Sequence, residues 1–320
     1  MGVSAKNIRN IAIVGHSGEG KTTLTEAILY NGGTIERMGR TDNGTTVSDF
    51  DEQEIARKIS ISLSVAYTTW KDVKLNLLDV PGFYDFEGEV NEAMRACGAA
   101  LVVTGANNSV SVGAEKAINQ CLKAKKPVVI FINGMDKENA DYSGAIRALT
   151  EKYKTKIAPI QIPLMEGNKM IGIVNALTGK AYKFTANGPE EIRVPAEYVS
   201  ELERIQYALT EAAAENDDVL LEKFFEEGAL TREEIIHGIR KGIYNINVIP
   251  VLAGSALQNK GVINLMNEIV KYLPEAAERG ELPATDLKKD AIVGITCDEN
   301  APFAAQVFKT AVDPFVGKLN

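Results

Sequence analysis

GHSGEGKT, at Gly15–Thr22, is the most informative stretch of the sequence. It fits the pattern G-x-x-x-x-G-K-[ST], a loop whose backbone N–H groups surround nucleotide phosphates. The apolar run Ile11–Val14 before it predicts a buried strand, and Lys21–Tyr30 after it predicts a helix. A strand that feeds a helix through this loop is the context that the pattern requires. We therefore interpret the stretch as a phosphate-binding loop and not as a chance glycine-rich turn.

The chemistry of such a loop follows from its backbone. Successive N–H groups point inward and the start of the helix adds positive potential, so an anion binds there. Lys21 is expected to reach the β- and γ-phosphates, and the Thr22 hydroxyl is expected to hold Mg²⁺. His16 is interpreted as a structural or solvent contact, with catalysis as the alternative. The predicted phosphate-binding residues are Gly15, His16, Ser17, Gly18, Glu19, Gly20, Lys21, Thr22 and Thr23.

The composition predicts a soluble globular protein of about two domains. The 320 residues are 45% hydrophobic and 24% charged. A net charge of −8 gives no overall basic field for nucleic acid, although it leaves a local basic face open. The three cysteines lie far apart without a C-x-x-C pair, which argues against a disulfide framework or zinc site and favours a reducing cytosol. No signal peptide is visible, and no apolar run approaches the ~18 residues that span a bilayer.

Strand and helix patterns alternate after the loop. Apolar and polar residues alternate over Ile59–Tyr67, which predicts a strand with one buried face; a turn near Lys71-Asp72 joins it to Leu75–Asp79 in a predicted hairpin. Further strands are predicted at 99–104 and 128–133, and helices at 87–97, 114–124 and 142–153. The pattern predicts an α/β fold: a mostly parallel sheet with helices on both faces and one antiparallel edge strand. Ligands of such sheets bind beyond the carboxyl ends of the strands.

The alternation breaks near residue 156 and resumes with a strand at Val248–Leu252 and a helix at 261–272. Residues 157–247, with short extended runs and then acidic helical segments, predict an inserted α+β subdomain. The predicted nucleotide-binding domain therefore comprises residues 1–156 and 248–275, followed by a linker at 276–290. Residues 291–320 begin something new, with strands predicted at Ile292–Thr296 and Ala305–Lys309. Thirty residues cannot close a core, so we expect this chain to be a fragment of a longer protein.

Asp79-Val80-Pro81-Gly82 follows the second strand of the predicted hairpin. In proteins with this phosphate loop, an Asp at that place holds Mg²⁺, usually through water. The Gly82 N–H is expected to contact the terminal phosphate. The pattern D-x-x-G alone is usually a turn, but its place after a strand that follows the phosphate loop favours a functional interpretation.

Asn133-Gly134-Met135-Asp136 lies at another strand end. A carboxylate at Asp136 can accept both the N1–H and the N2–H₂ of guanine, a pair of donors that adenine does not offer. The segment Ser255, Ala256 and Leu257 is expected to add a backbone N–H, from Ser255-Ala256, to guanine O6. A plain Asn/Asp turn is the alternative for the first motif.

These motifs together resemble the GTP-binding part of the translational GTPases, in particular elongation factor G and its paralogues. TTVSDFDEQEIARKISI (45–61) resembles the family's first switch, DVPGFYDF (79–86) its D-T-P-G-H-V-D-F, and GSALQNKGVINLMNEIVKY (254–272) its fifth motif and closing helix. APFAAQVFKTAVDPFVGKL (301–319) resembles the opening of the β-barrel domain that follows. The resemblance implies a P-loop NTPase G domain with an inserted subdomain and the start of β-barrel domain II.

The sequence departs from the family pattern at several site positions. Phe83 stands where the family has the His that positions the attacking water, and a phenyl ring cannot orient water. Ser60 stands for the switch Thr on Mg²⁺ and keeps a hydroxyl. Gly134 replaces the Lys of N-K-x-D, whose stem lies along the base, and Lys137 is a candidate to compensate. Gly18, Ser17 and Lys58 also differ from the family.

The resemblance implies a Mg²⁺-dependent GTP/GDP switch that hydrolyses GTP on the ribosome, slowly in isolation because of Phe83. Lys21, Ser60 and Gly82 are the predicted catalytic residues, and Thr22, Ser60 and Asp79 the predicted metal ligands. The alternatives are a GTP-binding regulatory module with negligible hydrolysis, and a ribosomal protection or release factor of the same superfamily. We expect a cytoplasmic, monomeric fragment that binds neither membranes nor specific DNA sequences.

Overall fold

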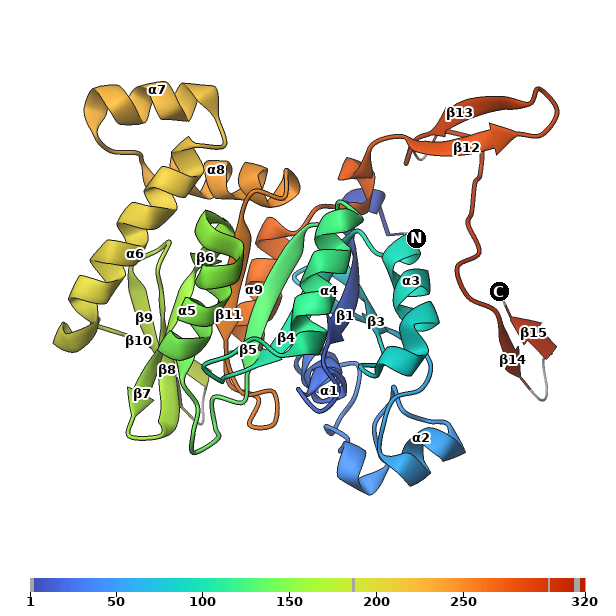
Figure 1. Cartoon of the computed structure of the whole chain (residues 1–320), viewed down its shortest axis with the longest axis horizontal. Helices are drawn as coiled ribbons and strands as arrows, with labels where there is room; N and C mark the ends of the chain where they lie inside the picture. The colour runs from blue at the N-terminus through green and yellow to red at the C-terminus, as the bar shows by residue number, and fades with distance from the viewer. Residues whose placement is uncertain (1–2, 186–187, 299, 314–316, 320) are drawn as a thin grey trace.

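Parallel strands of the main sheet (Figure 1) end at the phosphate loop, at Asp79 and at Asn133, so these three features lie at the same edge of the sheet. The computed structural model describes residues 3–185, 188–298, 300–313 and 317–319. Within them the main sheet has the strand order β2-β3-β1-β4-β5-β11-β6. All neighbouring strands pair in parallel except β2 and β3, which are antiparallel. The strands are β1 Ile8–Gly15, β2 Ser64–Trp70, β3 Val73–Asp79, β4 Ala99–Gly105, β5 Val128–Asn133, β6 Ile157–Pro159 and β11 Ile249–Ala253.

Helices cover both faces of this sheet. The buried side chains of β1, β4 and β5 alternate between two apolar clusters because successive side chains of a strand point to opposite faces. Helices α1 (Lys21–Asn31) and α9 (Val262–Tyr272) pack in the first cluster. Helices α3 (Glu87–Ala96), α4 (Val112–Lys123) and α5 (Tyr142–Tyr153) pack in the second. The predicted α/β fold class, with its antiparallel edge strand, is confirmed.

The β2–β3 hairpin corrects one prediction. The turn at Lys71 and Asp72 is as predicted and has positive φ at both residues. However, β2 begins only at Ser64, and the apolar Val65 and Tyr67 are exposed while Thr68 is buried. The predicted buried face is therefore wrong. The inward face carries Ala66 and Trp70, which pack against the first apolar cluster, and Thr68, whose hydroxyl accepts a hydrogen bond from Thr34 Oγ1 (2.7 Å). The opposite face of this edge strand meets solvent.

A second, antiparallel sheet of order β10-β9-β8-β7 follows β6. Its strands are β7 Gln161–Glu166, β8 Lys169–Asn175, β9 Lys180–Thr185 and β10 Gly188–Ile192, and helices α6 (Ala196–Ala214), α7 (Asp218–Glu227) and α8 (Arg232–Tyr244) come after them. Apolar residues of α6 and α8 join the first apolar cluster. Residues 157–159 form β6 and pair with β11, so the antiparallel sheet begins only at Gln161.

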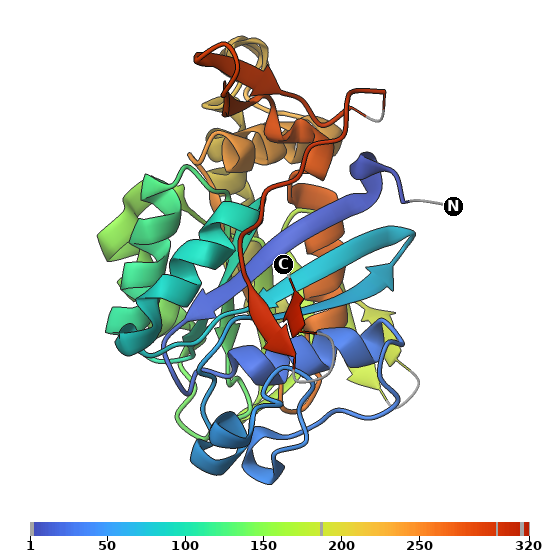
Figure 2. The same ribbon diagram turned by 90° about the vertical axis from the view of Figure 1, so that its right-hand side faces the viewer.

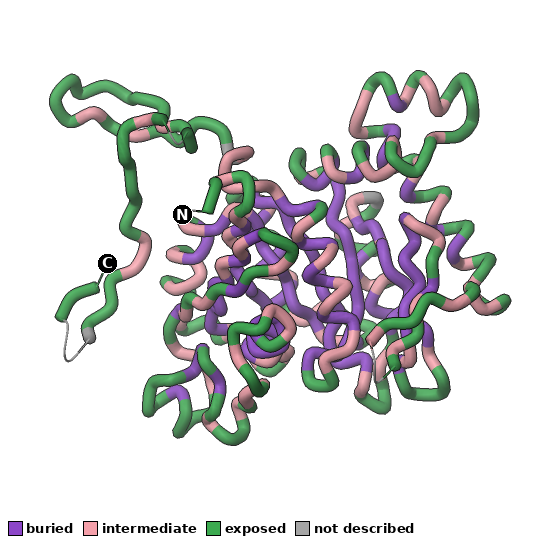
Figure 3. The backbone as a smooth tube through the Cα atoms, turned by 180° about the vertical axis from the view of Figure 1, so that it is seen from behind, coloured by how far each residue is buried: buried purple, intermediate pink, exposed green. Residues whose placement is uncertain are grey.

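The C-terminal part consists of two exposed strand pairs, β12–β13 and β14–β15 (Figures 2 and 3). The strands are β12 Leu282–Asp286, β13 Ala291–Ile295, β14 Ala311–Asp313 and β15 Gly317–Leu319. The predicted linker thus contains a strand, because 282–286 finds a partner in β13. The strand predicted at 305–309 does not form, since no neighbouring segment pairs with it. Residues 314–316 of the family-like motif lie outside the described residues. None of the described helices is both long and apolar enough to cross a membrane.

Candidate nucleotide-binding site

The phosphate loop leaves β1 at Gly15 and enters α1 at Lys21. Three glycines in it have φ values of +141° (Gly15), +79° (Gly18) and +89° (Gly20), which side chains with a Cβ rarely adopt. At Gly15 a Cβ would also lie 2.2 Å from the carbonyl oxygen of Val103. No side chain caps the start of α1, so its first N–H groups remain available to an anion.

Lys21 is held inside this loop as a buried cation. Its ammonium donates to the carbonyl oxygens of Gly15 (3.2 Å) and His16 (2.9 Å), and the residue is 6% exposed. Burial lowers the pKa of Lys21, while the nearby carboxylates of Asp79 and Glu19 counteract that effect. The positive charge is therefore oriented toward the loop before any ligand binds.

Gly82 lies directly against the loop. A Cβ at this position would come within 2.4 Å of Lys21 Nζ and 2.5 Å of the Ser17 backbone nitrogen. The backbone just before Gly82 is held in place, because Val80 is fully buried and its N–H donates to the Ile13 carbonyl oxygen. The fold thus brings the two predicted motifs together, and only glycine fits at position 82.

Oxygen atoms gather beside Lys21. The hydroxyls of Thr22 and Ser60 lie 3.2 Å apart, although the two residues are 38 positions apart in the sequence. Asp79 is 2% exposed, and neither of its carboxyl oxygens has a hydrogen-bond partner among the described residues, although the Thr22 and Ser48 hydroxyls lie near enough to favour its charged form. A buried carboxylate without donors, next to two hydroxyls, matches the hard oxygen ligands of Mg²⁺. The three predicted metal ligands therefore meet at one place.

Asp79 makes the stability of the folded protein depend on pH, and this effect can be measured without metal. Burial raises the pKa of its carboxyl from 3.8 to about 6, against the opposing effect of the Lys21 charge. Because the folded state binds this proton more tightly than the unfolded state, Asp79 contributes most to stability below about pH 4. As the pH rises through the folded-state pKa, this contribution is lost, and the free energy of unfolding falls by up to about 3 kcal/mol.

We therefore expect Asp79→Asn to raise the free energy of unfolding in EDTA at pH 8 and to change it little at pH 4. Urea unfolding curves at the two pH values measure the difference. Asp42→Asn, at an exposed carboxylate, is the control and should have no comparable pH dependence. A gain of equal size at both pH values for Asp79→Asn contradicts the explanation.

Asp49 belongs to the same cluster and was not predicted from the sequence. It is 5% exposed, and burial raises the pKa of its carboxyl, an effect that the nearby Ser60 hydroxyl partly offsets. The sequence did contain a signal, because Asp49 stands between Ser48 and Phe50 in the stretch that resembles the first switch. Its carboxylate adds a second negative charge to the predicted metal site.

Three other carboxylates, also not predicted from the sequence, bind backbone amides of the segment that carries Ser60. Glu26 of α1 accepts from the N–H groups of Gly39 (2.7 Å) and Val47 (2.6 Å). Glu54, in helix α2 (Glu52–Arg57), accepts from two further amides, and Glu89 of α3 accepts from another. A lone acidic residue on a buried helix face, such as Glu26 in TEAIL, is the pattern that could have indicated this role.

Asn133 connects the phosphate loop with the segment 255–257. Its amide donates to the Glu19 carbonyl (2.8 Å), and its Oδ1 accepts from the Ala256 N–H (2.9 Å). The Ala256 N–H, expected to serve guanine O6, is thus already used within the protein. The N–H of exposed Leu257 has no acceptor among the described residues, so it is the better placed donor.

The turn after Asn133 is well anchored. Met135 is buried and its N–H donates to the Gly254 carbonyl (3.1 Å), while Asp136 is only partly buried. Gly134 has φ +83°, and a Cβ added to Gly134 would lie 3.2–3.7 Å from carbon atoms of the Lys137 side chain. The Lys137 stem therefore occupies the space that a side chain at 134 would enter. Ser255 is fully buried and exchanges two backbone hydrogen bonds with Lys260.

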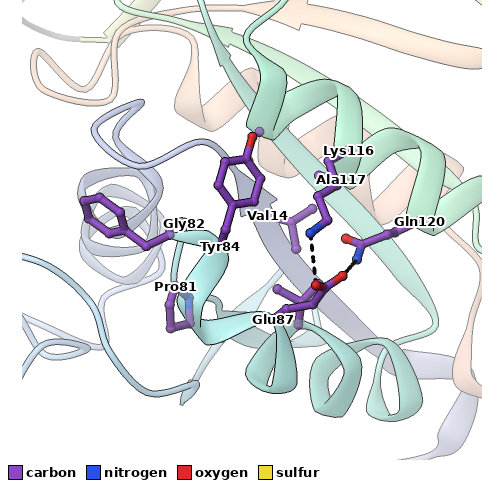
Figure 4. Close-up of a pocket in the computed structure, with 12 residues that line it drawn as sticks. Val14, Pro81, Gly82, Tyr84, Glu87, Lys116, Ala117 and Gln120 are labelled. Atoms are coloured by element: carbon purple, nitrogen blue, oxygen red, sulfur yellow. Dashed lines mark hydrogen bonds and ion pairs between the residues drawn. The ribbon is translucent and has the colours of Figure 1, made fainter.

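Tyr84 and Glu87, which follow Gly82, lie against α4 (Figure 4). Phe83 is 41% exposed, and the ring of Tyr84, in the short turn η3 (Tyr84–Phe86), lies 4.9 Å from Lys116 Nζ. Lys116 also forms an ion pair of 3.0 Å with Glu87, as Figure 4 shows. Between η3, α3 and α4 remains a cavity of about 30 Å³, which is room for a single water molecule.

The model of one protein family matches most of the chain, from residue 6 to residue 275. That family is described as the elongation factor Tu GTP-binding domain. The chain belongs to the elongation factor Tu GTP-binding domain family. The resemblance inferred from the motifs is thereby confirmed.

Two known proteins are similar to this chain over nearly its whole length. Elongation factor G of Mycoplasma genitalium is 35% identical over 320 residues, which are 99% of this chain and 46% of that protein. A crystal structure of a protein from Thermus thermophilus has a TM-score of 0.85 and 33% identity, and the match covers 98% of this chain and 44% of that one. The chain therefore spans less than half the length of these relatives.

Proposed function

We propose that this chain is the guanine-nucleotide module of a translation factor resembling elongation factor G, and that it binds and hydrolyses GTP. The observation that carries this proposal is the convergence, on one phosphate loop, of Lys21, Gly82 and the oxygen cluster around Asp79. Lys21, Ser60 and Gly82 belong to three different sequence motifs, and nothing in any one motif requires the others to lie there. The family to which the chain belongs supports the same function.

In the proposed reaction, the loop N–H groups and the buried Lys21 ammonium bind the phosphates and stabilise the charge that develops during transfer. Gly82, without a side chain, lets its backbone approach the terminal phosphate. Thr22, Ser60 and Asp79, with Asp49 nearby, are the residues that would hold Mg²⁺. When bound, the metal ion would neutralise charge on the phosphate oxygens.

Guanine selectivity is assigned to Asp136, with the Leu257 N–H as the donor to guanine O6. Asn133 positions both sides by bridging the phosphate loop and residue 256. Calorimetric titration of the chain with GDP and with ADP, both with Mg²⁺, tests the assignment. We expect GDP to bind at least about 100-fold more tightly, because a site built to pair polar groups rejects a ligand that lacks them. Equal affinities exclude the guanine assignment.

A second candidate function is a GTP-bound regulatory module whose hydrolysis is negligible. Phe83 favours it, because an apolar ring stands directly after Gly82 where the family has histidine. Ribosome binding, a cytoplasmic location and a monomeric fragment follow from the family resemblance and are parts of the proposal. A ribosomal protection or release factor would share all of these features in this part of the chain.

Phe83→His distinguishes the first two functions. A histidine at 83 can orient and deprotonate water, so we expect the rate of single-turnover GTP hydrolysis to rise roughly 10- to 100-fold. This rise is no larger than the smallest rate enhancements that general acid–base catalysis typically provides. Phe83→Leu, which stays apolar, is the matched control and should not raise the rate. If the histidine variant hydrolyses GTP no faster than wild type, Phe83 is not what limits the reaction.

A further inference from the structure

Three successive amides after Ser60 are held by carboxylates from two helices. The N–H groups of Ile61 (2.9 Å) and Ser62 (3.0 Å) donate to Glu54 Oε1, and the N–H of Leu63 donates to Glu89 Oε2. Glu89 lies in α3, the helix that follows Gly82 through η3. One carboxylate therefore connects the segment that carries Ser60 with the segment that carries Gly82.

Lys309, from the C-terminal part of the chain, completes this junction. Its ammonium donates to Glu89 Oε2 (2.8 Å) and to the Leu63 carbonyl (2.7 Å). The two charged side chains are only 21% and 24% exposed. The neighbouring Phe308 packs against the apolar cluster that contains α3 and α4. The contact therefore joins three segments that are distant in the sequence.

We propose that Glu89 and Lys309 are a positioning pair that fixes Ser60 and Gly82 relative to each other. Through this pair, the position of the C-terminal segment depends on whether the terminal phosphate of the nucleotide is bound. The inference rests on the proposed GTP-binding function. Glu89 and Lys309 lie outside the phosphate loop, and they act only through Leu63 and α3. A ligand with a γ-phosphate needs both Ser60 and Gly82 in place, whereas a diphosphate needs the loop and Lys21.

Affinities for GTPγS and for GDP, measured by calorimetry with Mg²⁺ on the 320-residue chain, test the proposal. We expect Glu89→Gln and Lys309→Met each to weaken GTPγS binding roughly tenfold, the value of about one charge-assisted hydrogen bond, and to change GDP binding less than about twofold. The double variant should lose no more than either single variant, because the two groups act as a unit. Lys309→Arg, which keeps the charge, should stay within about twofold of wild type.

Hydrogen exchange of the peptide containing residues 59–64 gives a readout that does not depend on nucleotide. Lys309→Met should speed exchange there, whereas Glu115→Gln, which breaks the ion pair with Lys152 between α4 and α5, should not. Equal losses of GTPγS and GDP affinity, additive losses in the double variant, or unchanged exchange overturn the proposal. A wild-type chain that fails to prefer GDP over ADP refutes the proposed function instead, so the two failures are distinguishable.

Discussion

Lys21→Met is expected to weaken GDP binding about 10³-fold. The Lys21 ammonium is buried and already directed into the phosphate loop by two carbonyl oxygens. Methionine preserves the length and apolar stem of the side chain but removes the charge that faces the diphosphate. Loss of one partner from a buried, hydrogen-bonded charge pair costs roughly 2–5 kcal/mol, and a 10³-fold change corresponds to about 4 kcal/mol.

Titration calorimetry with GDP measures this effect, and Lys123→Met provides the control. Lys123 is an exposed lysine near the end of α4, so its substitution should leave the affinity for GDP unchanged. The melting temperature of both variants shows whether they are folded. If Lys21→Met binds GDP within about tenfold of wild type, the phosphates do not lie where the loop geometry predicts.

Asp136→Asn is expected to reverse the base preference, with the ratio of GDP to xanthosine diphosphate affinity falling about 10³-fold. Guanine offers two donors, N1–H and N2–H₂, which a carboxylate can accept together. Xanthine carries a carbonyl in place of the amino group, and an asparagine amide can donate to that oxygen. An unmatched polar pair costs roughly 1–3 kcal/mol for each group, so two mismatches produce a change of this size.

Affinities for both nucleotides in wild type and variant measure the reversal. Glu138→Gln, two residues later on the exposed side of the same turn, is the matched control and should keep the preference for GDP. A variant at 136 with the wild-type preference places the base elsewhere. A loss of all nucleotide binding together with a lowered melting temperature indicates a damaged turn, and Asp136→Glu then repeats the test with the charge kept.

Sequence patterns predicted the elements whose determinants are local. The buried strands β4 and β5 and the helix α5 were found within a residue or two, because their apolar periodicity is long and uninterrupted. The β2 prediction was wrong in its buried face, because the alternation of Val65 and Tyr67 resembles that of a core strand. The inward face instead carries Ala66 and Trp70, which pack against the first apolar cluster, and Thr68, which contacts Thr34; these tertiary contacts are not visible from the sequence.

Within the candidate site, the motif residues were predictable and their supports were not. Lys21, Asp79 and Asn133 stand at fixed offsets from strand ends, so the sequence pattern alone is enough to place them. Glu26 and Glu89 act through hydrogen bonds with backbone groups 13 to 26 residues away. Asp49 acts through its electrostatic interactions with nearby charged side chains. Such contacts depend on how a long irregular segment folds back on the helices, which no short pattern describes.

The way in which residues 39–63 are attached has a consequence for how they move. Their backbone is held to the rest of the domain by the side chains of Glu26 and Glu89 and not by pairing with the main sheet, while Glu54 binds amides within the stretch itself. Detaching this stretch would break these hydrogen bonds and expose Leu63, but it would leave every strand ladder intact. It can therefore open on its own, at a free-energy cost well below that of unfolding the domain. The molecule thus couples a rigid frame to a part that is easily rearranged.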